Sequence, residues 1–160
     1  MSHPEPDLQE IRARALRLLS RRSHSRFQLE QKLLLHHPPG EVAALLEELV
    51  ERRLLDDASL AEDRALMLRS RRHWGTYRIQ RDLRKLGFDA KIVARAVDQA
   101  ESAFPSEETL ARVIEIWTGR KGDPGSVAAL KKLFEHCRRL GFPPQMVWDL
   151  LEPFRGRLNG

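Results

Sequence analysis

The sequence contains one cysteine, few aromatic residues and no long apolar run. Cys137 is the only cysteine, so an internal disulfide and a cysteine-rich zinc site are both excluded. Aromatic residues make up 6% of the chain, and Thr and Tyr are rare, which argues against long β-sheets. No apolar segment approaches the roughly 20 residues that a membrane-spanning helix needs. Residues 1–8 are polar and acidic, without the apolar stretch of a signal peptide, so we expect a cytoplasmic protein.

The composition that remains is typical of a helical protein with a highly charged surface. Hydrophobic residues make up 41% and charged residues 32% of the 160 positions. This length suffices for one ordinary domain or for a few small stacked units.

The apolar pattern of the chain repeats after 50 residues. Phe27, Leu29, Leu33 and Val42 correspond to Tyr77, Ile79, Leu83 and Ile92. A third copy follows at a slightly longer spacing, in which Leu130, Phe134, Leu140-Gly141-Phe142 and Met146 correspond to Ile79, Leu83, Leu86-Gly87-Phe88 and Ile92. Such repeats indicate stacked helical units, each too small to bury its apolar face alone. We therefore predict an all-α chain of three tandem three-helix repeats, at 1–54, 55–104 and 105–160, which form an extended curved solenoid.

The helices are predicted from apolar residues at helical spacing and from Pro, Gly, Ser and Asp at the breaks. Asp56-Asp57 and Asp89 are expected to cap helix starts, and Gly87 is expected to end a helix. The predicted helices cover 7–21, 41–53, 57–72, 76–86, 89–103, 107–118, 126–140 and 144–153, and a further helix is capped by Ser23 or Ser25 and ends at Leu35. Residues 119–125 are predicted to form the one long loop, and the chain from Phe154 onward a frayed tail.

The basic residues are concentrated in one segment. Residues 69–85 contain seven basic side chains and only Asp82 as an acidic one, so this segment carries +6 and the rest of the chain −1. On the predicted helix 76–86, Ile79, Leu83 and Leu86 share one face, and Arg78, Arg81 and Lys85 share the opposite face. This pattern is typical of a surface for an acidic or polyanionic partner. The alternative is that Arg69, Arg71 and Arg72 only favour a helix C-terminus and that the excess of arginine reflects genome composition.

Several residue clusters suggest catalysis or metal binding, but each has a simpler structural interpretation. His36-His37 point apart on a helix and lack a carboxylate at ligand spacing. Asp56-Asp57 is more simply a helix cap than a catalytic pair, and the glycine-rich segment 119–125 lacks the Gly-Lys-Ser/Thr ending of a phosphate loop. Cys137 has no His–Asp partners and is expected to be a packed side chain. We therefore expect neither an enzyme nor a cofactor or metal site.

The order of these features resembles the RecX regulators of bacterial recombination. The similarity lies in Ser23-His24-Ser25 through Leu33, Leu54-Leu55-Asp56-Asp57, Leu60-Ala61, Arg69-Ser70-Arg71-Arg72, Gly75, Ile79, Leu83 and Gly87. It covers residues 15–97 well and the remainder by the repeat pattern. The chain departs from the family pattern at Gln28-Leu29, where Glu-Leu is common, and at His73-Trp74-Gly75-Thr76-Tyr77.

The resemblance implies a non-enzymatic regulator that binds RecA and the RecA–DNA filament. Members of this family consist of three three-helix repeats, lie along the filament groove and restrain filament growth, ATP hydrolysis, strand exchange and the stimulation of repressor self-cleavage. Some members also bind single- or double-stranded DNA directly. The implied chain is a monomer that works in DNA repair, DNA recombination and the SOS response, without a membrane partner.

The predicted contact surface combines the basic segment with one aromatic residue. It consists of Arg69, Arg71, Arg72, Trp74, Arg78, Arg81 and Lys85. Trp74 could stack on a base or an arginine, although packing at the corner between two helices is favoured, and the same holds for Tyr77. Two other functions stay open: a DNA-binding repeat module that acts without RecA, and a scaffold for an unrelated protein.

Overall fold

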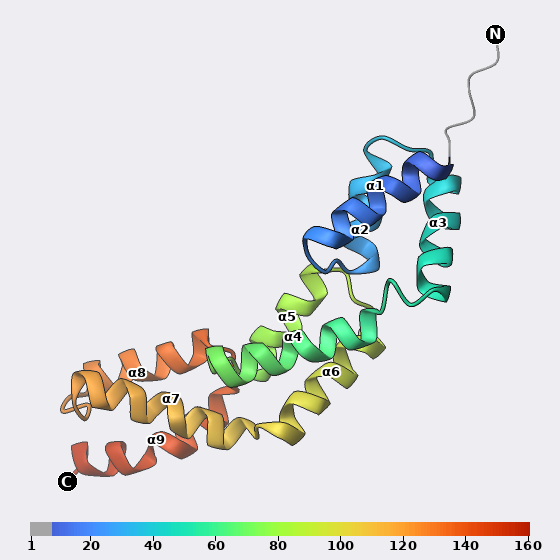
Figure 1. Cartoon of the computed structure of the whole chain (residues 1–160). Helices are drawn as coiled ribbons and strands as arrows, with labels where there is room; N and C mark the ends of the chain where they lie inside the picture. Colours follow the sequence, from blue (N-terminus) through green and yellow to red (C-terminus); the bar gives the residue numbers. More distant parts are fainter. Residues whose placement is uncertain (1–7) are drawn as a thin grey trace.

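The structure is a computed structural model that describes residues 8–160, and in this range the chain forms nine α-helices and no strand (Figure 1). Their bounds are α1 Leu8–Arg21, α2 Arg26–Leu34, α3 Pro39–Glu51, α4 Asp57–Arg72, α5 Thr76–Lys85, α6 Ala90–Ala103, α7 Ser106–Lys121, α8 Val127–Arg139 and α9 Pro144–Leu158. The predicted all-α helical-repeat fold is confirmed. No helix in the described range is long and apolar enough to cross a bilayer.

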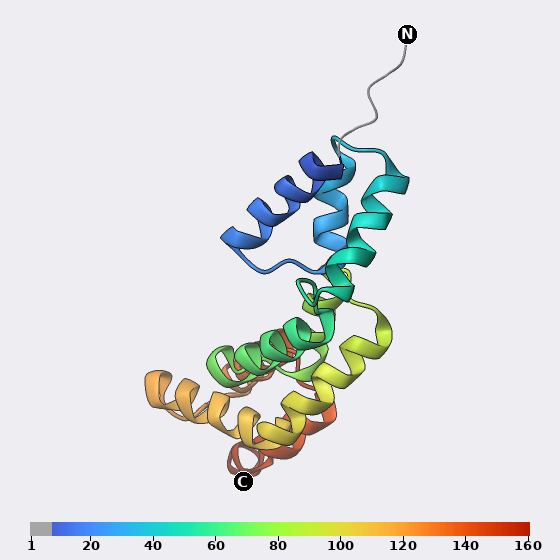
Figure 2. The same ribbon diagram turned by 45° about the vertical axis from the view of Figure 1, so that its right-hand side comes forward.

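Buried apolar residues form three separate cores along an arc (Figures 1 and 2). The first core draws on α1–α3, the second on α4–α6 and the third on α7–α9, and we call each three-helix group a unit. In the second core, Ala61 and Ala65 of α4 face Ala96 and Ala100 of α6, and these small side chains allow the two helices to pack closely. Leu55 packs in the first core, and the repeat limits at residues 54 and 104 stay a prediction.

Side-chain caps mark where α2, α4, α6 and α8 begin. Asp56 accepts a hydrogen bond from the Ser59 backbone N–H, and Asp89 accepts one from that of Ile92, as predicted for a helix start. Ser25 and Gln28 form a reciprocal capping box at α2. These caps satisfy backbone N–H groups that the first helical turn leaves free.

The first and second units join where the turn after α5 meets the start of α2. Gly87 has φ +80°, and a Cβ atom there would lie 2.2 Å from Cγ of Phe27. The Ser25 hydroxyl donates to the Leu86 carbonyl, and the Arg26 backbone N–H donates to Asp57 Oδ1 at 2.9 Å. Gly87 is therefore required for two reasons, its left-handed backbone and the lack of space.

The second and third units join in the same manner. Gly141, with φ +98°, lies against α5, where a Cβ atom would approach Cβ of Arg78 to 2.5 Å. The Gly75 backbone N–H donates to the Leu140 carbonyl at 2.6 Å, and the N–H of Tyr77 donates to the Gly141 carbonyl at 3.1 Å. The Leu-Gly-Phe segments that the repeat pattern aligns thus perform the same packing role in the second and third units.

Two of the predicted helix ends are wrong at the third unit. The chain beyond Phe154 is not a frayed tail, because α9 continues through Pro153 to Leu158, and Phe154 and Leu158 pack against the third core. The predicted loop 119–125 is shorter, since α7 extends to Lys121. At the first unit, Pro39 begins α3 instead of separating two helices, because the first helical position needs no backbone N–H donor. Asp7, the predicted first residue of the first helix, lies outside the described residues.

Candidate partner-binding surface

Helix α5 presents the predicted basic stripe to solvent. Ile79 and Leu83 are fully buried in the second core, and Leu86 packs partly against it. Arg81 and Lys85 on the opposite face are exposed, and so is Arg84. The predicted division of this helix into an apolar and a basic face is confirmed.

The basic charge of α5 is not neutralised by neighbouring carboxylates. Asp82, the one acidic residue of the segment, accepts two hydrogen bonds from Arg64, at 2.5 and 3.1 Å. Among the basic residues of the segment 69–85, Arg69 forms an ion pair. Within residues 8–160, the other six form none; they are Arg71, Arg72, Arg78, Arg81, Arg84 and Lys85. A row of cations without carboxylate partners raises the local potential and attracts anionic groups.

Trp74 occupies the corner between α4 and α5. It is partly buried against the second core, and the Arg78 guanidinium lies 3.9 Å from the centre of its ring. This arrangement favours the packing interpretation of Trp74 and adds a cation–π contact. The packing interpretation is wrong for Tyr77, which is 57% exposed, and Phe27 at the corresponding repeat position is 44% exposed.

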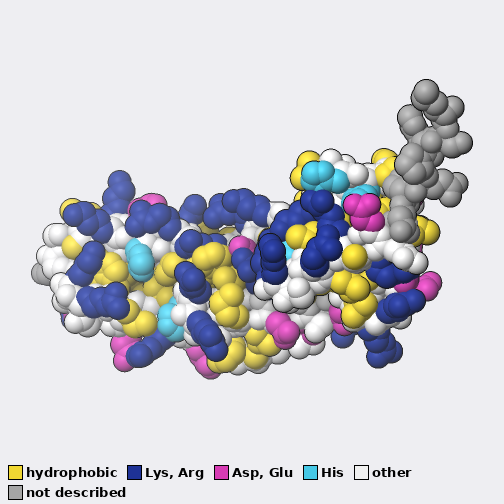
Figure 3. Space-filling view, turned by 45° about the horizontal axis from the view of Figure 1, so that its top comes forward, with side chains coloured by type: hydrophobic (Ala, Val, Ile, Leu, Met, Phe, Trp, Pro, Cys, Tyr) yellow, Lys and Arg dark blue, Asp and Glu magenta, His cyan; other side chains and the backbone are white. Residues whose placement is uncertain are grey.

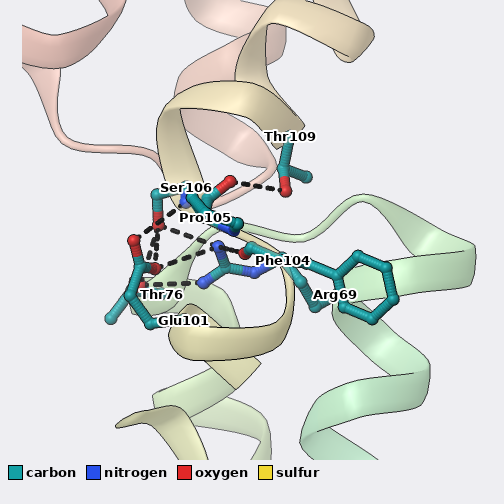
Figure 4. Close-up of polar contacts among 7 residues, drawn as sticks. All are labelled: Arg69, Thr76, Glu101, Phe104, Pro105, Ser106 and Thr109. Carbon is teal, nitrogen blue, oxygen red and sulfur yellow. Dashed lines mark hydrogen bonds and ion pairs between the residues drawn. The ribbon is translucent and has the colours of Figure 1, made fainter. Parts of the chain in front are cut away.

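Arg69 does not lie on the surface that the sequence predicted. Its side chain has no exposed area, and its guanidinium donates to the Glu101 carboxylate, the Phe104 carbonyl and the hydroxyls of Ser106 and Thr76, at 2.8–3.1 Å (Figure 4). Arg69 therefore joins α4 to the α6–α7 connection and cannot contact a partner in this structure. The other two candidates on α4, Arg71 and Arg72, are exposed in the last turn of this helix.

Burial and hydrogen bonding act in opposite directions on this ion pair, in which Arg69 is buried and Glu101 is half-buried. Burial lowers the pKa of Arg69, and the charge of Glu101 opposes this effect. For Glu101, burial disfavours the carboxylate, but hydrogen bonds from Ser106 and the charge of Arg69 outweigh it, so the pKa lies below its usual value. The surroundings therefore favour the charged form of Glu101, whereas burial disfavours the charge of Arg69.

The basic surface continues onto the third unit, which the sequence analysis missed. Arg138 and Arg139 at the end of α8 are exposed, and Arg78 Nη1 donates to the Arg139 carbonyl at 3.3 Å across the junction. Figure 3 shows Lys and Arg side chains gathered along the face that carries these helices. We call Arg78, Arg81, Arg84, Lys85, Arg138 and Arg139 the α5–α8 basic surface. The contact of Leu140-Gly141 with α5 brings the basic residues of α8 next to those of α5. This contact exists only in the tertiary structure, so the sequence did not reveal it.

The residues for which the sequence offered a chemical role occupy structural positions. Asp56 caps α4, and Asp57 accepts a hydrogen bond from α2. Cys137 is buried, and burial raises the pKa of its thiol to about 12, so it is uncharged at neutral pH. No cluster of His, Cys, Asp and Glu in residues 8–160 has the arrangement of a metal site.

Comparison with known proteins identifies relatives over nearly the whole chain. Residues 12–49 match the family model for the first three-helix domain of RecX. The regulatory protein RecX of Halorhodospira halophila is 39% identical over 150 residues, which cover 92% of this chain and 89% of that protein. The regulatory protein RecX of Ralstonia nicotianae is 36% identical over 146 residues, 89% of this chain and 86% of the relative.

Solved structures share the fold at lower sequence identity. The crystal structure of RecX from Lactobacillus salivarius superposes with a TM-score of 0.80 at 19% identity, over 92% of this chain and 96% of that one. The fold is thus common to proteins whose sequences have diverged widely. With relatives this similar over this much of its length, the chain belongs to the RecX family of regulatory proteins.

Proposed function

We propose that this protein binds RecA and the RecA–DNA filament and that it restrains filament growth, ATP hydrolysis and strand exchange. The observation that carries the proposal is the α5–α8 basic surface, whose cations have no carboxylate partner among the described residues. The regulatory role of the family supports the same conclusion, and RecA is the partner that the resemblance implies. The protein acts by binding and by no chemical step of its own.

The extended shape favours a filament as the target. Three units along an arc offer a surface that spans neighbouring subunits of a polymer (Figure 2). Contacts that are weak individually strengthen one another when they are linked in one chain, because the second contact forms at a high effective concentration. Inhibition is therefore expected below one protein molecule per RecA.

The first prediction concerns the basic surface and RecA's ATP hydrolysis on single-stranded DNA. Arg81→Glu combined with Lys85→Glu reverses two exposed charges without removing a contact, so the fold is retained and the concentration for half inhibition rises. Each exposed charge contributes roughly 0.2–1 kcal/mol, so the loss of both contributions raises this concentration by about twofold to thirtyfold. Lys91→Glu with Arg120→Glu, which are exposed on other helices, is the control with the same net charge.

The result that contradicts this prediction is equal inhibition by the two double variants. Absence of any effect of the unaltered protein on RecA, at all ratios, would reject RecA as the partner. A pull-down that recovers a different protein would then favour the scaffold function.

Direct binding of nucleic acid without RecA is the second candidate, and the same unpaired cations favour it. About five phosphate contacts predict a log–log salt slope near −3.5 for single strands. A variant that no longer binds naked DNA but still inhibits the filament would separate the two functions and reject this one.

A further inference from the structure

In the first and second units, the following unit covers the start of the middle helix. The Leu86-Gly87 turn of the second unit lies on Phe27 in the first turn of α2. The carbonyls of Leu140 and Gly141 in the third unit accept hydrogen bonds from backbone N–H groups at the start of α5, at 2.6 and 3.1 Å. In both cases the cover is a helix end that turns through a glycine with positive φ. We call the surface at the start of each middle helix, together with the adjoining end of the unit's third helix, the stacking face of that unit.

The stacking face of the third unit has no cover within residues 8–160. The Ser126 hydroxyl accepts a hydrogen bond from the Ala129 backbone N–H, but the N–H groups of Val127 and Ala128 have no acceptor among the described residues. The Val127 side chain is 73% exposed. In Figure 1 the start of α8 and the end of α9 lie together at the end of the arc, away from the second unit.

An apolar groove of about 230 Å³ lies on this face, between α8 and α9. Its lining residues are Val127, Leu130, Trp148, Arg155, Leu158 and Asn159. In the first unit, the corresponding pocket lies beside Arg26 and Val50, and residues of α4 and α6 complete its other wall. In the third unit no later element of the described chain completes the wall. Terminal units of a repeat array usually carry a polar outer face, so an apolar groove at this end indicates a binding partner.

A second copy of this chain does not fit the groove in the same manner. The first unit has His37 where the second unit has Gly87, and the φ of His37 is not positive. A Cβ atom at Gly87 or Gly141 would lie 2.2 or 2.5 Å from an atom of the preceding unit. The turn of the first unit therefore cannot stack on α8, and the two glycine turns of a second copy are already used inside that copy. The occupant is a different protein.

We propose that the stacking face of the third unit binds a helix end of a protein partner that turns through a glycine after an apolar residue, as Leu86-Gly87 and Leu140-Gly141 do. The apolar residue fills the groove between Val127 and Trp148, and carbonyls of the partner's last turn accept hydrogen bonds from the free N–H groups of α8. The negative end of one helix dipole then meets the positive end of another, which is favourable. That the partner is RecA rests on the proposed function.

A peptide titration followed by nuclear magnetic resonance tests the groove without RecA. The probe is an unlabelled peptide of residues 127–144 of this chain, held helical by a lactam bridge, because its Leu140-Gly141 turn covers α5 in the intact protein. In the ¹⁵N-labelled full chain, we expect the backbone N–H signals of Val127 and Ala128 and the indole signal of Trp148 to shift. A peptide with Gly141→Ala should leave them in place. Equal shifts with the two peptides would overturn the glycine turn as the ligand, and no shift with either would overturn the site.

Filament binding by Val127→Glu tests whether RecA supplies the turn. The substitution is at an exposed position, so the fold is retained, and the lost apolar contact should weaken binding about five- to tenfold. Ala111→Glu, exposed on α7, makes the same charge change and is the control. Equal binding by the two variants would overturn RecA as the source of the turn. Self-association of the unaltered protein in sedimentation, if Val127→Glu abolishes it, would assign the groove to a second copy and overturn the proposal.

The two experiments separate this proposal from the proposed function. If the unaltered protein does not bind the filament, the proposed function fails, and the peptide titration still decides whether the groove binds a glycine turn.

Discussion

At the residue scale, Arg69 shows how a charge in a basic run differs from its neighbours. Seen in sequence, Arg69, Arg71 and Arg72 are three similar cations at the end of one helix. In the structure only Arg69 turns inward, because Glu101 and two hydroxyls supply acceptors that satisfy its terminal nitrogens. A buried charge persists only when it is paired and hydrogen-bonded. Arg69 is thus a structural residue of the second junction.

Substitution of Arg69 is expected to destabilise the protein. Arg69→Met removes the cation of this network and leaves Glu101 without its ion-pair partner and the Phe104 carbonyl without its donor, so the free energy of unfolding should fall by about 3 kcal/mol. Arg71→Met is the control, since Arg71 is exposed in the same turn. Denaturant unfolding measures both variants. An equal, small effect of the two substitutions would mean that the network contributes little.

His24 is expected to make stability depend on pH. Its ring is buried, Nδ1 lies 2.8 Å from the Arg22 carbonyl, and Nε2 lies 3.1 Å from Lys32 Nζ. Burial lowers the pKa of His24, the Arg22 carbonyl opposes this, and the charges of Arg22 and Lys32 lower the pKa further. The folded protein therefore favours the neutral ring, and protonation favours unfolding.

The sign of the effect follows from the lowered pKa. The stabilisation from His24 is present above its unfolded pKa near 6.5 and is lost as the pH falls through the folded value, at about 1.4 kcal/mol per pH unit between the two. Burial also lowers the pKa of His136, so His24→Gln is compared with His136→Gln. Unfolding free energies between pH 7.5 and 5 should show a flatter dependence in each variant, and an unchanged slope in His24→Gln would contradict the assignment.

At the element scale, two glycine turns determine how the units meet. Gly87 and Gly141 both have positive φ and both lie against the preceding unit's second helix. The position in the first unit that corresponds to Gly87 after the shift of 50 residues is His37. Within the described residues no unit precedes the first, so the turn there has no helix to approach. A glycine thus occurs at this position where a unit contacts the preceding unit, and it is not a general feature of the repeat.

Gly141→Ala is expected to weaken the junction between the second and third units. The added Cβ meets Arg78 at 2.5 Å, and the left-handed backbone adds roughly 1–2 kcal/mol for a non-glycine residue, so a loss of about 2–4 kcal/mol follows. Gly119→Ala is the control: it lies inside α7 with nothing within 4 Å and should stabilise the helix by about 0.5–1 kcal/mol. Thermal unfolding of both variants checks this pair, and a neutral Gly141→Ala would show that the junction adapts.

At the scale of the whole molecule, three small cores are held in one arc by narrow junctions. The first junction relies on few polar contacts, among them those of Ser25 and Arg26, whereas the second adds the buried Arg69 network. The α5–α8 basic surface crosses the second junction, so its shape depends on how two units are oriented. The structure thus connects the stability of that junction with the geometry of the proposed binding surface.

The sequence by itself determined the helical periodicity, most helix starts and the repeat, because these depend on neighbours three or four residues apart and on local caps. It also placed the basic face of α5, since Ile79 and Leu83 define the buried side of the same helix. The burial of Arg69, the meeting of Arg78 with Arg139 and the continuation of α9 past Pro153 were decided by the tertiary structure. Each of these depends on contacts between segments that the chain brings together only when the units stack, and no local pattern encodes such distances.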